Sequence, residues 1–272
     1  MASQYLDERQ VEAYRNFEYD FSTEKWGGRV VLVAGGAGGL GAAFVAWLLA
    51  RGALPVVGYK SNHERARRLQ AALEARSGRA LALVDGDITG EAARTQYVRA
   101  ASSRAGVLYG LACFVGDPAR VPFTDLTQAD VQASLAANYL GPVLLAKAFA
   151  EAVIDRQAEG SIVFISSMQG VAAFAGSVNY GGPKAALNHA ARIYAKQWRA
   201  ARLRVNVVAP GATVAGMAEA SIRSGKYDGY VAERIIPRFG RPEDVAAAVG
   251  WLMQPDGYVT GQVITVDGGL SL

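Results

Sequence analysis

The chain has 272 residues, enough for one large α/β domain or two small ones, and 51% of them are hydrophobic. With 19% charged residues, this composition excludes a disordered chain. The net charge of +4 is not concentrated in a dense Lys/Arg block, which argues against a nucleic-acid surface and fits a basic cleft for an anionic small molecule.

From about residue 28, short β-branched runs alternate with longer helical stretches. The run 29–34 (RVVLVA) is typical of a strand buried on both faces. Further strands are expected at 54–59, 80–84, 107–115, 161–165, 204–208 and 263–266, and helices at 42–50, 63–76, 91–104, 125–156 with a division near 138–142, 180–201 and 242–253. This alternation predicts one α/β domain, 26–272, with a doubly wound, seven-stranded parallel sheet and helices on both faces.

Two segments stand outside the alternation. Residues 1–25 form an N-terminal extension, which either packs on a neighbouring subunit or frays. Residues 211–240 interrupt the series just after a strand. Because ligands of open α/β sheets bind beyond the carboxyl ends of the strands, we expect a substrate lid there.

Several other features restrict the location and cofactors of the protein. The single cysteine, Cys113, allows no intramolecular disulfide, lies in an apolar run and is expected in a buried strand. We expect no metal site. The N-terminal residues are not typical of a secretory signal, and no run approaches 18 uninterrupted apolar residues. The sequence therefore predicts a cytoplasmic protein that does not span a membrane.

A glycine-rich turn joins the first strand to the first helix. Its glycines fit two patterns, Gly36, Gly38 and Gly41 or Gly35, Gly39 and Gly41. Glycine lets the backbone approach a pyrophosphate, whose charge is met by the helix N-terminus. A tight turn needs glycine whatever its function, but this position between a buried strand and a helix predicts nucleotide binding.

The end of the second strand bears on the choice of cofactor. NAD-binding sites place an acid there, whereas this chain has Lys60 and Ser61, which suit a 2′-phosphate, with further charge from Arg65 or Arg67. The alternative is a helix cap at Ser61 or Asn62 beside a solvated lysine. We expect NADPH/NADP+ in preference to NADH.

An acidic segment, Asp85-Gly86-Asp87, follows the third strand. A carboxylate there can accept a hydrogen bond from the adenine amino group or cap the next helix. We assign the adenine to Asp87.

The segment NYGGPKAAL, 179–187, places Tyr180 and Lys184 on one helical face. A nearby ammonium, together with the positive nicotinamide, should lower the pKa of a tyrosine from its usual value near 10 and suit it to proton exchange. Pro183 is expected in the first helical turn, where its missing N–H breaks no hydrogen bond. Gly181 and Gly182 are expected to leave the space beside the cofactor free of side chains.

Ser167 lies thirteen residues before Tyr180, and with Tyr180-x-x-x-Lys184 the chain resembles the short-chain dehydrogenase/reductase family from about residue 26 to its C-terminus. The glycine turn in its second pattern, the Pro210-Gly211 pair and the ordered C-terminal motifs strengthen the resemblance. It implies a Rossmann fold, a subgroup similar to 3-oxoacyl-thioester reductases, and a reaction that interconverts a small-molecule ketone and a secondary alcohol.

The resemblance also implies the roles of the site residues. Tyr180 exchanges the proton, Ser167 orients the carbonyl, Lys184 holds the nicotinamide ribose, and Asn138 holds a water that connects Lys184 to solvent. The expected cofactor contacts are Gly35, Gly38, Gly39, Leu40, Gly41, Lys60, Ser61, Asp87, Ile88, Phe114, Gly116, Tyr180, Lys184, Pro210, Gly211 and Thr213. Family members are often homotetramers, so a tetramer or dimer is expected.

The chain departs from the family at two cofactor positions. Cys113-Phe114-Val115 replaces Asn-Asn-Ala before Gly116, which makes the pocket more apolar and removes polar bracing of the sheet. Ala215 replaces a threonine that contacts the carboxamide. Two alternatives follow: enoyl reduction, disfavoured because residue 187 is leucine where a lysine seven after the tyrosine is usual, and an NADP(H)-binding sensor or scaffold without catalysis.

Overall fold

The computed structural model describes residues 15–16 and 26–272, and the rest of the predicted N-terminal extension lies outside these residues. Seven parallel strands form one sheet in the order β3-β2-β1-β4-β5-β6-β7, which confirms the predicted fold class. The strands are β1 (Arg29–Ala34), β2 (Leu54–Tyr59), β3 (Ala82–Asp85), β4 (Val107–Cys113), β5 (Gly160–Ile165), β6 (Leu203–Pro210) and β7 (Val263–Val266). The helices are α2 (Gly39–Ala50), α3 (His63–Ser77), α4 (Glu91–Ser102), α5 (Gln128–Leu135), α6 (Gly141–Ile154), α7 (Val178–Gln197), α8 (Glu219–Arg223), α9 (Asp228–Ala232) and α10 (Pro242–Met253).

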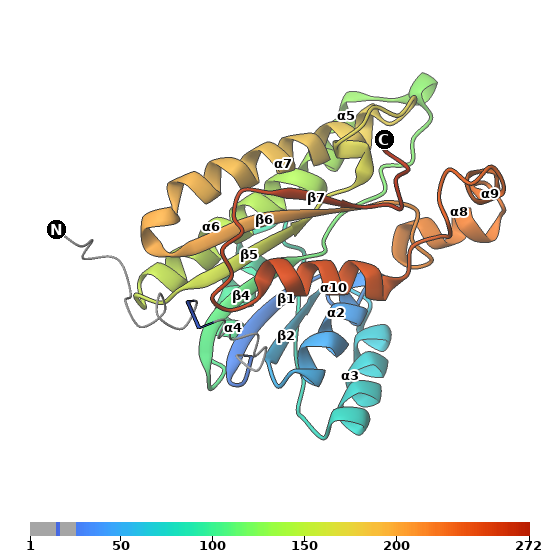
Figure 1. Cartoon of the computed structure of the whole chain (residues 1–272). Coiled ribbons are helices and arrows are strands. Elements are labelled where there is room, and N and C mark those ends of the chain that lie inside the picture. Colours follow the sequence, from blue (N-terminus) through green and yellow to red (C-terminus); the bar gives the residue numbers. More distant parts are fainter. Residues whose placement is uncertain (1–14, 17–25) are drawn as a thin grey trace.

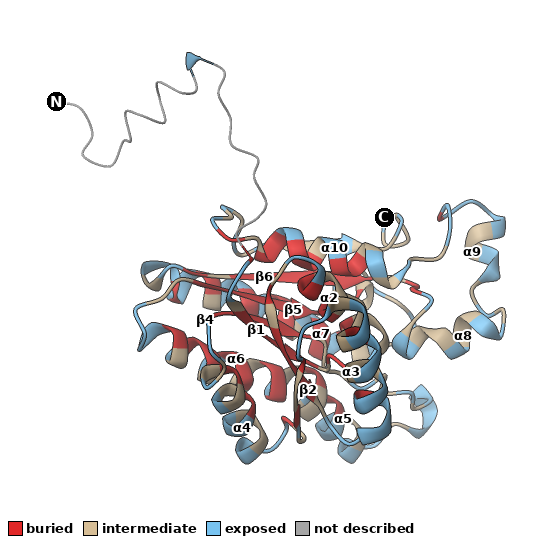
Figure 2. Cartoon of the chain, turned by 90° about the horizontal axis from the view of Figure 1, so that it is seen from below, coloured by how far each residue is buried: buried red, intermediate tan, exposed pale blue. Residues whose placement is uncertain are grey.

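Helices cover both faces of the sheet (Figure 1). One core joins the sheet to α4, α6 and α7, and the other joins it to α2, α3 and α10. Figure 2 shows the buried residues gathered on the strands and on the inner helix faces. Residues 30–34 of β1 are all fully buried because both cores press on them, as the run of β-branched residues predicts. The sheet is thus the rigid platform from which the site loops emerge.

The predicted division of the long helical segment 125–156 is a π-helical turn, Ala136–Leu140, between α5 and α6. The helix therefore continues through the turn, and Pro142 falls at the start of α6, directly after the π turn has interrupted the α-helical hydrogen-bond pattern. Thr127 and Asp130 form a capping box that starts α5. Such π turns are frequent at functional sites, and this one carries the predicted site residue Asn138.

The same segment also has the length and composition of a membrane span. Within the described chain one helical stretch, Gln128–Ile154, meets that test, with a mean hydropathy of 1.2 and 44% of its most apolar window buried. Leu145, Phe149 and Val153 are fully buried against the sheet. Packing in the core therefore accounts for the apolar character of this helix.

Helix α7 begins at Val178, two residues before Tyr180, so the predicted helix start at Tyr180 is wrong. Pro183 consequently lies inside the helix and not in its first turn. A residue at position 183 would ordinarily donate its N–H to the carbonyl of Asn179, four residues earlier. The hydroxyl of Ser134 in α5 donates to that carbonyl instead.

Candidate active site

A cavity of about 720 Å³ lies at the carboxyl ends of β4, β5 and β6. Its walls come from the segments that follow these strands, from the start of α7 and from the lid. Eight of the predicted site residues line it: Leu40, Phe114, Ser167, Tyr180, Lys184, Pro210, Gly211 and Thr213. The sequence placed the site at this edge because parallel strands deliver their carboxyl ends to one side of a sheet.

Tyr180 and Ser167 meet at the wall of this cavity. Ser167 follows β5 and precedes a short 3₁₀ turn, where its Oγ accepts a hydrogen bond from the backbone N–H of Gln169 at 3.2 Å. Desolvation by the surrounding protein raises the pKa of Tyr180 to about 12, although a hydrogen bond with the Ser167 side chain acts in the opposite direction. The phenol is therefore protonated at neutral pH.

Lys184 lies behind Tyr180 and is only 1% exposed. Its Nζ donates to the carbonyl oxygen of Ile165 at 3.0 Å and lies 5.7 Å from the centroid of the Tyr180 ring. Burial lowers the pKa of Lys184 to about 8. Among the protein groups, desolvation of the phenol outweighs the opposing hydrogen bond with Ser167, and a lowering of the Tyr180 pKa by Lys184 together with a bound nicotinamide stays a prediction.

Asn138 is fully buried in the π turn, and both ends of its amide are held by the backbone of Asp117. Its Oδ1 accepts from the Asp117 N–H at 3.0 Å, and its Nδ2 donates to the Asp117 carbonyl at 2.9 Å. A Cβ at Gly116 would lie 2.8 Å from Asn138 Oδ1 and 3.1 Å from Lys184 Nζ. The absence of a side chain at Gly116 thus leaves the amide oxygen and the ammonium facing the same small space.

The glycine turn has the form that a dinucleotide pyrophosphate requires. Gly35 has a φ of +76°, and a Cβ there would lie 2.9 Å from the backbone carbon of Phe114. Gly38 is the N-cap of α2 and has no side chain to cap the first N–H groups of the helix. A Cβ at Gly39 would come 2.5 Å from the backbone nitrogen of Gly216 in the lid. Because the first turn of α2 has no acid to compete, its N–H groups suit an anion.

The predicted adenine end of the cofactor groove lies at the ends of β2 and β3. Lys60 Nζ and Asp87 Oδ2 form an ion pair of 2.7 Å, and Asp87 Oδ1 accepts from the Thr89 N–H at 3.0 Å. Although partial burial alone would raise the pKa of Asp87, the Lys60 and Thr89 hydrogen bonds lower it below its usual value. Ile88 is buried beside them. Asn62, and not Ser61, caps α3 through the Arg65 N–H.

The apolar replacement before Gly116 does not leave the end of β4 unsupported. The Phe114 N–H donates to Ala34 O at 2.8 Å, and the Phe114 ring lies 5.8 Å from the ring of Phe44 in α2. Cys113 is buried, as predicted, and burial raises the pKa of its thiol to about 11. At the end of β4, aromatic packing therefore replaces the polar side chains that are usual in the family.

The two ends of the lid are hydrogen-bonded to each other where they meet the sheet, and we call these residues, 212–214 and 240, the neck of the lid. Thr213 and Gly240 form a parallel bridge, with hydrogen bonds of 2.9 Å from Gly240 N to Ala212 O and from Val214 N to Gly240 O. Beyond the neck, α8 and α9 lie apart from the sheet (Figure 1). At Gly211, a Cβ would lie 2.5 Å from the Cβ of Asp267, which explains this glycine by packing. The Thr213 hydroxyl donates to the Gly211 carbonyl at 3.2 Å.

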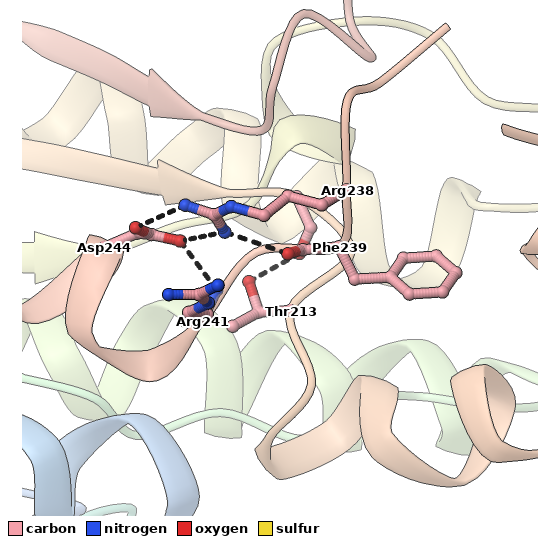
Figure 3. Close-up of polar contacts among 6 residues, drawn as sticks. Thr213, Arg238, Phe239, Arg241 and Asp244 are labelled. Carbon is pink, nitrogen blue, oxygen red and sulfur yellow. Dashed lines mark hydrogen bonds and ion pairs between the residues drawn. The ribbon is translucent and has the colours of Figure 1, made fainter. Parts of the chain in front are cut away.

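A bidentate ion pair fastens the neck to α10 (Figure 3). Arg238 donates to Asp244 at 2.6 and 2.9 Å, and the Arg241 N–H donates to Asp244 Oδ2 at 2.7 Å. The Arg238 hydrogen bond is the main reason why the pKa of Asp244 falls to about 2. The carboxylate thus links the end of the lid to the first turn of α10.

We expect Asp244→Asn to lower the free energy of unfolding by about 1 kcal/mol at neutral pH, an amount discounted because both side chains are partly exposed. The folded pKa lies below the unfolded value near 3.9, so this stabilisation is present above about pH 4 and is lost as the pH falls towards 2. Urea midpoints of the protein and the variant should differ fully at pH 6 and converge as the pH falls from 4 towards 2. Glu243→Gln, in the same helical turn, is the control; an Asp244→Asn difference that is constant over this range contradicts the prediction.

Gly181 has a packing role that was not foreseen, and the expectation that Gly181 and Gly182 leave space beside the cofactor stays a prediction. A Cβ at Gly181 would lie 2.5 Å from the carbonyl oxygen of Gln169, so this glycine lets α7 approach the segment after β5. At Gly182, nothing described lies within 4 Å of a Cβ.

Within residues 15–16 and 26–272, no group of three His, Cys, Asp or Glu side chains is placed to hold a metal ion.

Three residues of the site were missed in the sequence. Asp117 orients Asn138 through its backbone, which no side-chain pattern reveals. Arg120 donates to the carbonyl of Met217 and so joins the loop after β4 to the lid. Ser134 bonds both Asn138 and Asn179. The only available signal was the position of Ser134, four residues before Asn138 on a helix.

Comparisons with known proteins agree with this geometry. A family described as "Enoyl-(Acyl carrier protein) reductase" matches residues 35–271. An uncharacterized oxidoreductase of Methylorubrum extorquens is 32% identical over 89% of this chain and 98% of its own length, and an acetoacetyl-CoA reductase of Synechocystis is 32% identical over 88% and 95%. The structure of a short-chain type dehydrogenase/reductase from Mycobacterium ulcerans has a TM-score of 0.84 and 29% identity, with 90% of each chain covered. The chain belongs to the short-chain dehydrogenase/reductase family, and it is therefore an oxidoreductase that uses a nicotinamide cofactor.

Proposed function

We propose that the protein is an NADPH-dependent reductase that converts a ketone to a secondary alcohol, with Ser167, Tyr180, Lys184 and Asn138 as its catalytic set. The observation that carries this proposal is the convergence of the Tyr180 phenol and the Ser167 hydroxyl on one cavity, with a buried ammonium behind them. A ketone oxygen placed between the two hydroxyls would receive a hydrogen bond from one and a proton from the other.

Tyr180, Ser167 and Lys184 have separate roles in the reduction. When bound, the reduced nicotinamide supplies the hydride. Tyr180, protonated because its pKa is raised to about 12, donates its proton to the forming alkoxide, and Ser167 orients the carbonyl. The Lys184 ammonium lies close enough to stabilise the resulting phenolate.

The lining of the cavity supports a partly apolar substrate with an anionic group. Pro118, Val121 and Phe174 contribute apolar surface. Arg120 and Lys226 also line the cavity, and none of its described lining residues is acidic. A 3-oxoacyl thioester combines such a ketone with an anionic carrier, and the relative named acetoacetyl-CoA reductase supports this class.

The preference for NADPH is supported by the charge near the end of β2. The Lys60 side chain is 71% exposed and can turn from Asp87 to a 2′-phosphate, beside the hydroxyl of Ser61. Arg65 Nε donates to Ala37 O at 2.7 Å, which holds a second cation against the glycine turn. Asp87 remains the proposed adenine contact.

Two other functions receive less support. Enoyl reduction would usually place a lysine seven residues after Tyr180, and that position is Leu187, 1% exposed in the core. A sensor or scaffold that binds NADP(H) without catalysis would not need the Tyr180 phenol and the Ser167 hydroxyl together on one cavity. A homo-oligomer and a cytoplasmic location stay predictions.

The test is NADPH oxidation by the purified protein, followed at 340 nm, with β-ketoacyl thioesters, diketones, quinones, cyclic ketones and keto-sugars. We expect the highest kcat/KM with an anionic β-ketoacyl thioester, and at least a tenfold loss with NADH in place of NADPH. Tight NADPH binding with no turnover of any carbonyl would favour the sensor, and a lower KM for NADH would overturn the cofactor assignment.

A further inference from the structure

Ser134 lies where two irregular helical segments meet. It is 3% exposed, stands at the end of α5 just before the π turn, and faces the first turns of α7. Neither the glycine turn nor the Ser167, Tyr180 and Lys184 set requires a hydroxyl at this place. Its surroundings nevertheless contain two polar groups that need one.

The first of these groups is the carbonyl of Asn179. Pro183 has no N–H, so the Asn179 carbonyl loses the donor that an α-helix would supply from position 183. Asn179 is 7% exposed, and an unpaired buried carbonyl is costly. The Ser134 hydroxyl donates its single hydrogen to this oxygen. Pro183 therefore determines the direction in which the Ser134 hydroxyl points.

The second group is the amide of Asn138. Because the only hydrogen of the Ser134 hydroxyl is used on Asn179, its oxygen can only accept from Asn138. Asn138 Nδ2 donates to it at 3.1 Å and donates its other hydrogen to Asp117 O at 2.9 Å. Both amide hydrogens are then used, and Oδ1, which accepts from Asp117 N, is left with one lone pair.

We propose that Ser134, directed by Pro183, is a positioning residue that fixes the Asn138 amide with its oxygen towards Lys184. The Gly116 geometry shows that Asn138 Oδ1 and Lys184 Nζ face one space. A reversed amide would turn N–H groups towards an ammonium. The hydrogen bonds from Pro183 to Asn138 add to those of the Asp117 backbone in opposing that reversal and keep an acceptor available to the proton path.

The test combines two double-mutant cycles, which separate structural from catalytic effects. Ser134→Ala should lower Tm by about 5 °C, because the Asn179 carbonyl is left unpaired. In a Pro183→Ala background, where position 183 again supplies an N–H, the same change should lower Tm by about 1 °C or less. Because alanine at position 183 suits the interior of α7, the double variant Ser134→Ala, Pro183→Ala should also stay folded.

The second cycle measures kcat. Ser134→Ala should lower kcat roughly tenfold and leave the Kd for NADPH within about twofold, since the residue acts on the proton path alone. In an Asn138→Ala background it should change kcat by less than about twofold. Ser161→Ala, which removes another fully buried serine hydroxyl, is the matched control and should leave kcat unchanged.

An equal loss of kcat in both backgrounds would overturn the positioning role, and an equal loss of Tm with and without Pro183 would overturn the role of the proline. The proposal rests on the proposed reductase activity for its kcat cycle only. If no carbonyl is reduced, the Tm cycle still tests the Ser134–Pro183 link, so the two failures are distinguishable.

Discussion

Replacing Tyr180 by phenylalanine is expected to lower kcat about 1,000-fold, because the change removes the proposed proton donor to the carbonyl. The Kd for NADPH should stay within about threefold, since the ring and its packing are kept. Single-turnover NADPH oxidation and fluorescence titration of the cofactor measure the two quantities separately.

Tyr194→Phe is the matched control for this change. Tyr194 stands on the same helix, α7, but its hydroxyl donates to Val143 O and lies away from the cavity. Its kcat should equal that of the unchanged protein. If Tyr180→Phe retained a tenth of the activity or more, the proton donor would have to be another group.

Gly41→Ala is expected to weaken NADPH binding about 100-fold. A Cβ at Gly41 would collide with the carbonyl oxygen of Gly35 and lie 2.8 Å from the Cα of Gly36, both backbone atoms that cannot swing aside. The glycine turn must then open, at a cost of about 1–3 kcal/mol, and its N–H groups leave the positions that an anion requires. Calorimetric titration gives the Kd, and thermal unfolding should show a fall in Tm.

Gly229→Ala makes the same chemical change in α9, where a Cβ would approach only the Glu233 carboxylate, at 3.7 Å. Cofactor affinity should not change in this control. Unaltered NADPH binding by Gly41→Ala would mean that the pyrophosphate does not bind at this turn.

The fold was predictable because its signals are local. The strand 29–34 is buried on both faces, and its β-branched sequence reports that directly. Element ends were less accurate: the helix expected from Tyr180 begins at Val178 because a turn at Ser177 already supplies the carbonyl for Gly181 N. Helix boundaries depend on such single hydrogen bonds, which sequence patterns do not resolve.

The identities of the main site residues were predictable, but their pKa shifts and ion pairs were not. Helical spacing placed Tyr180 and Lys184 on one face, and the resemblance to the family added Ser167. The desolvation that raises the pKa of Tyr180 was not foreseen, because it depends on the whole wall around the phenol. The Lys60–Asp87 ion pair was also missed, since its partners come from different strands and meet only in the folded chain.

The neck of the lid has a consequence for how substrate range can change. Residues 212–214 and 240 are bonded to each other, so the intervening segment leaves and rejoins the sheet at one point. A segment with adjoining ends can be exchanged for one of another length with little strain on the scaffold. The lid residues Met217, Ser221 and Tyr227 line the cavity, whereas Tyr180 and Lys184 lie outside the exchanged piece. The lid part of the cavity wall is thus separable from Tyr180 and Lys184, and we expect lid grafts between relatives to alter the substrate range.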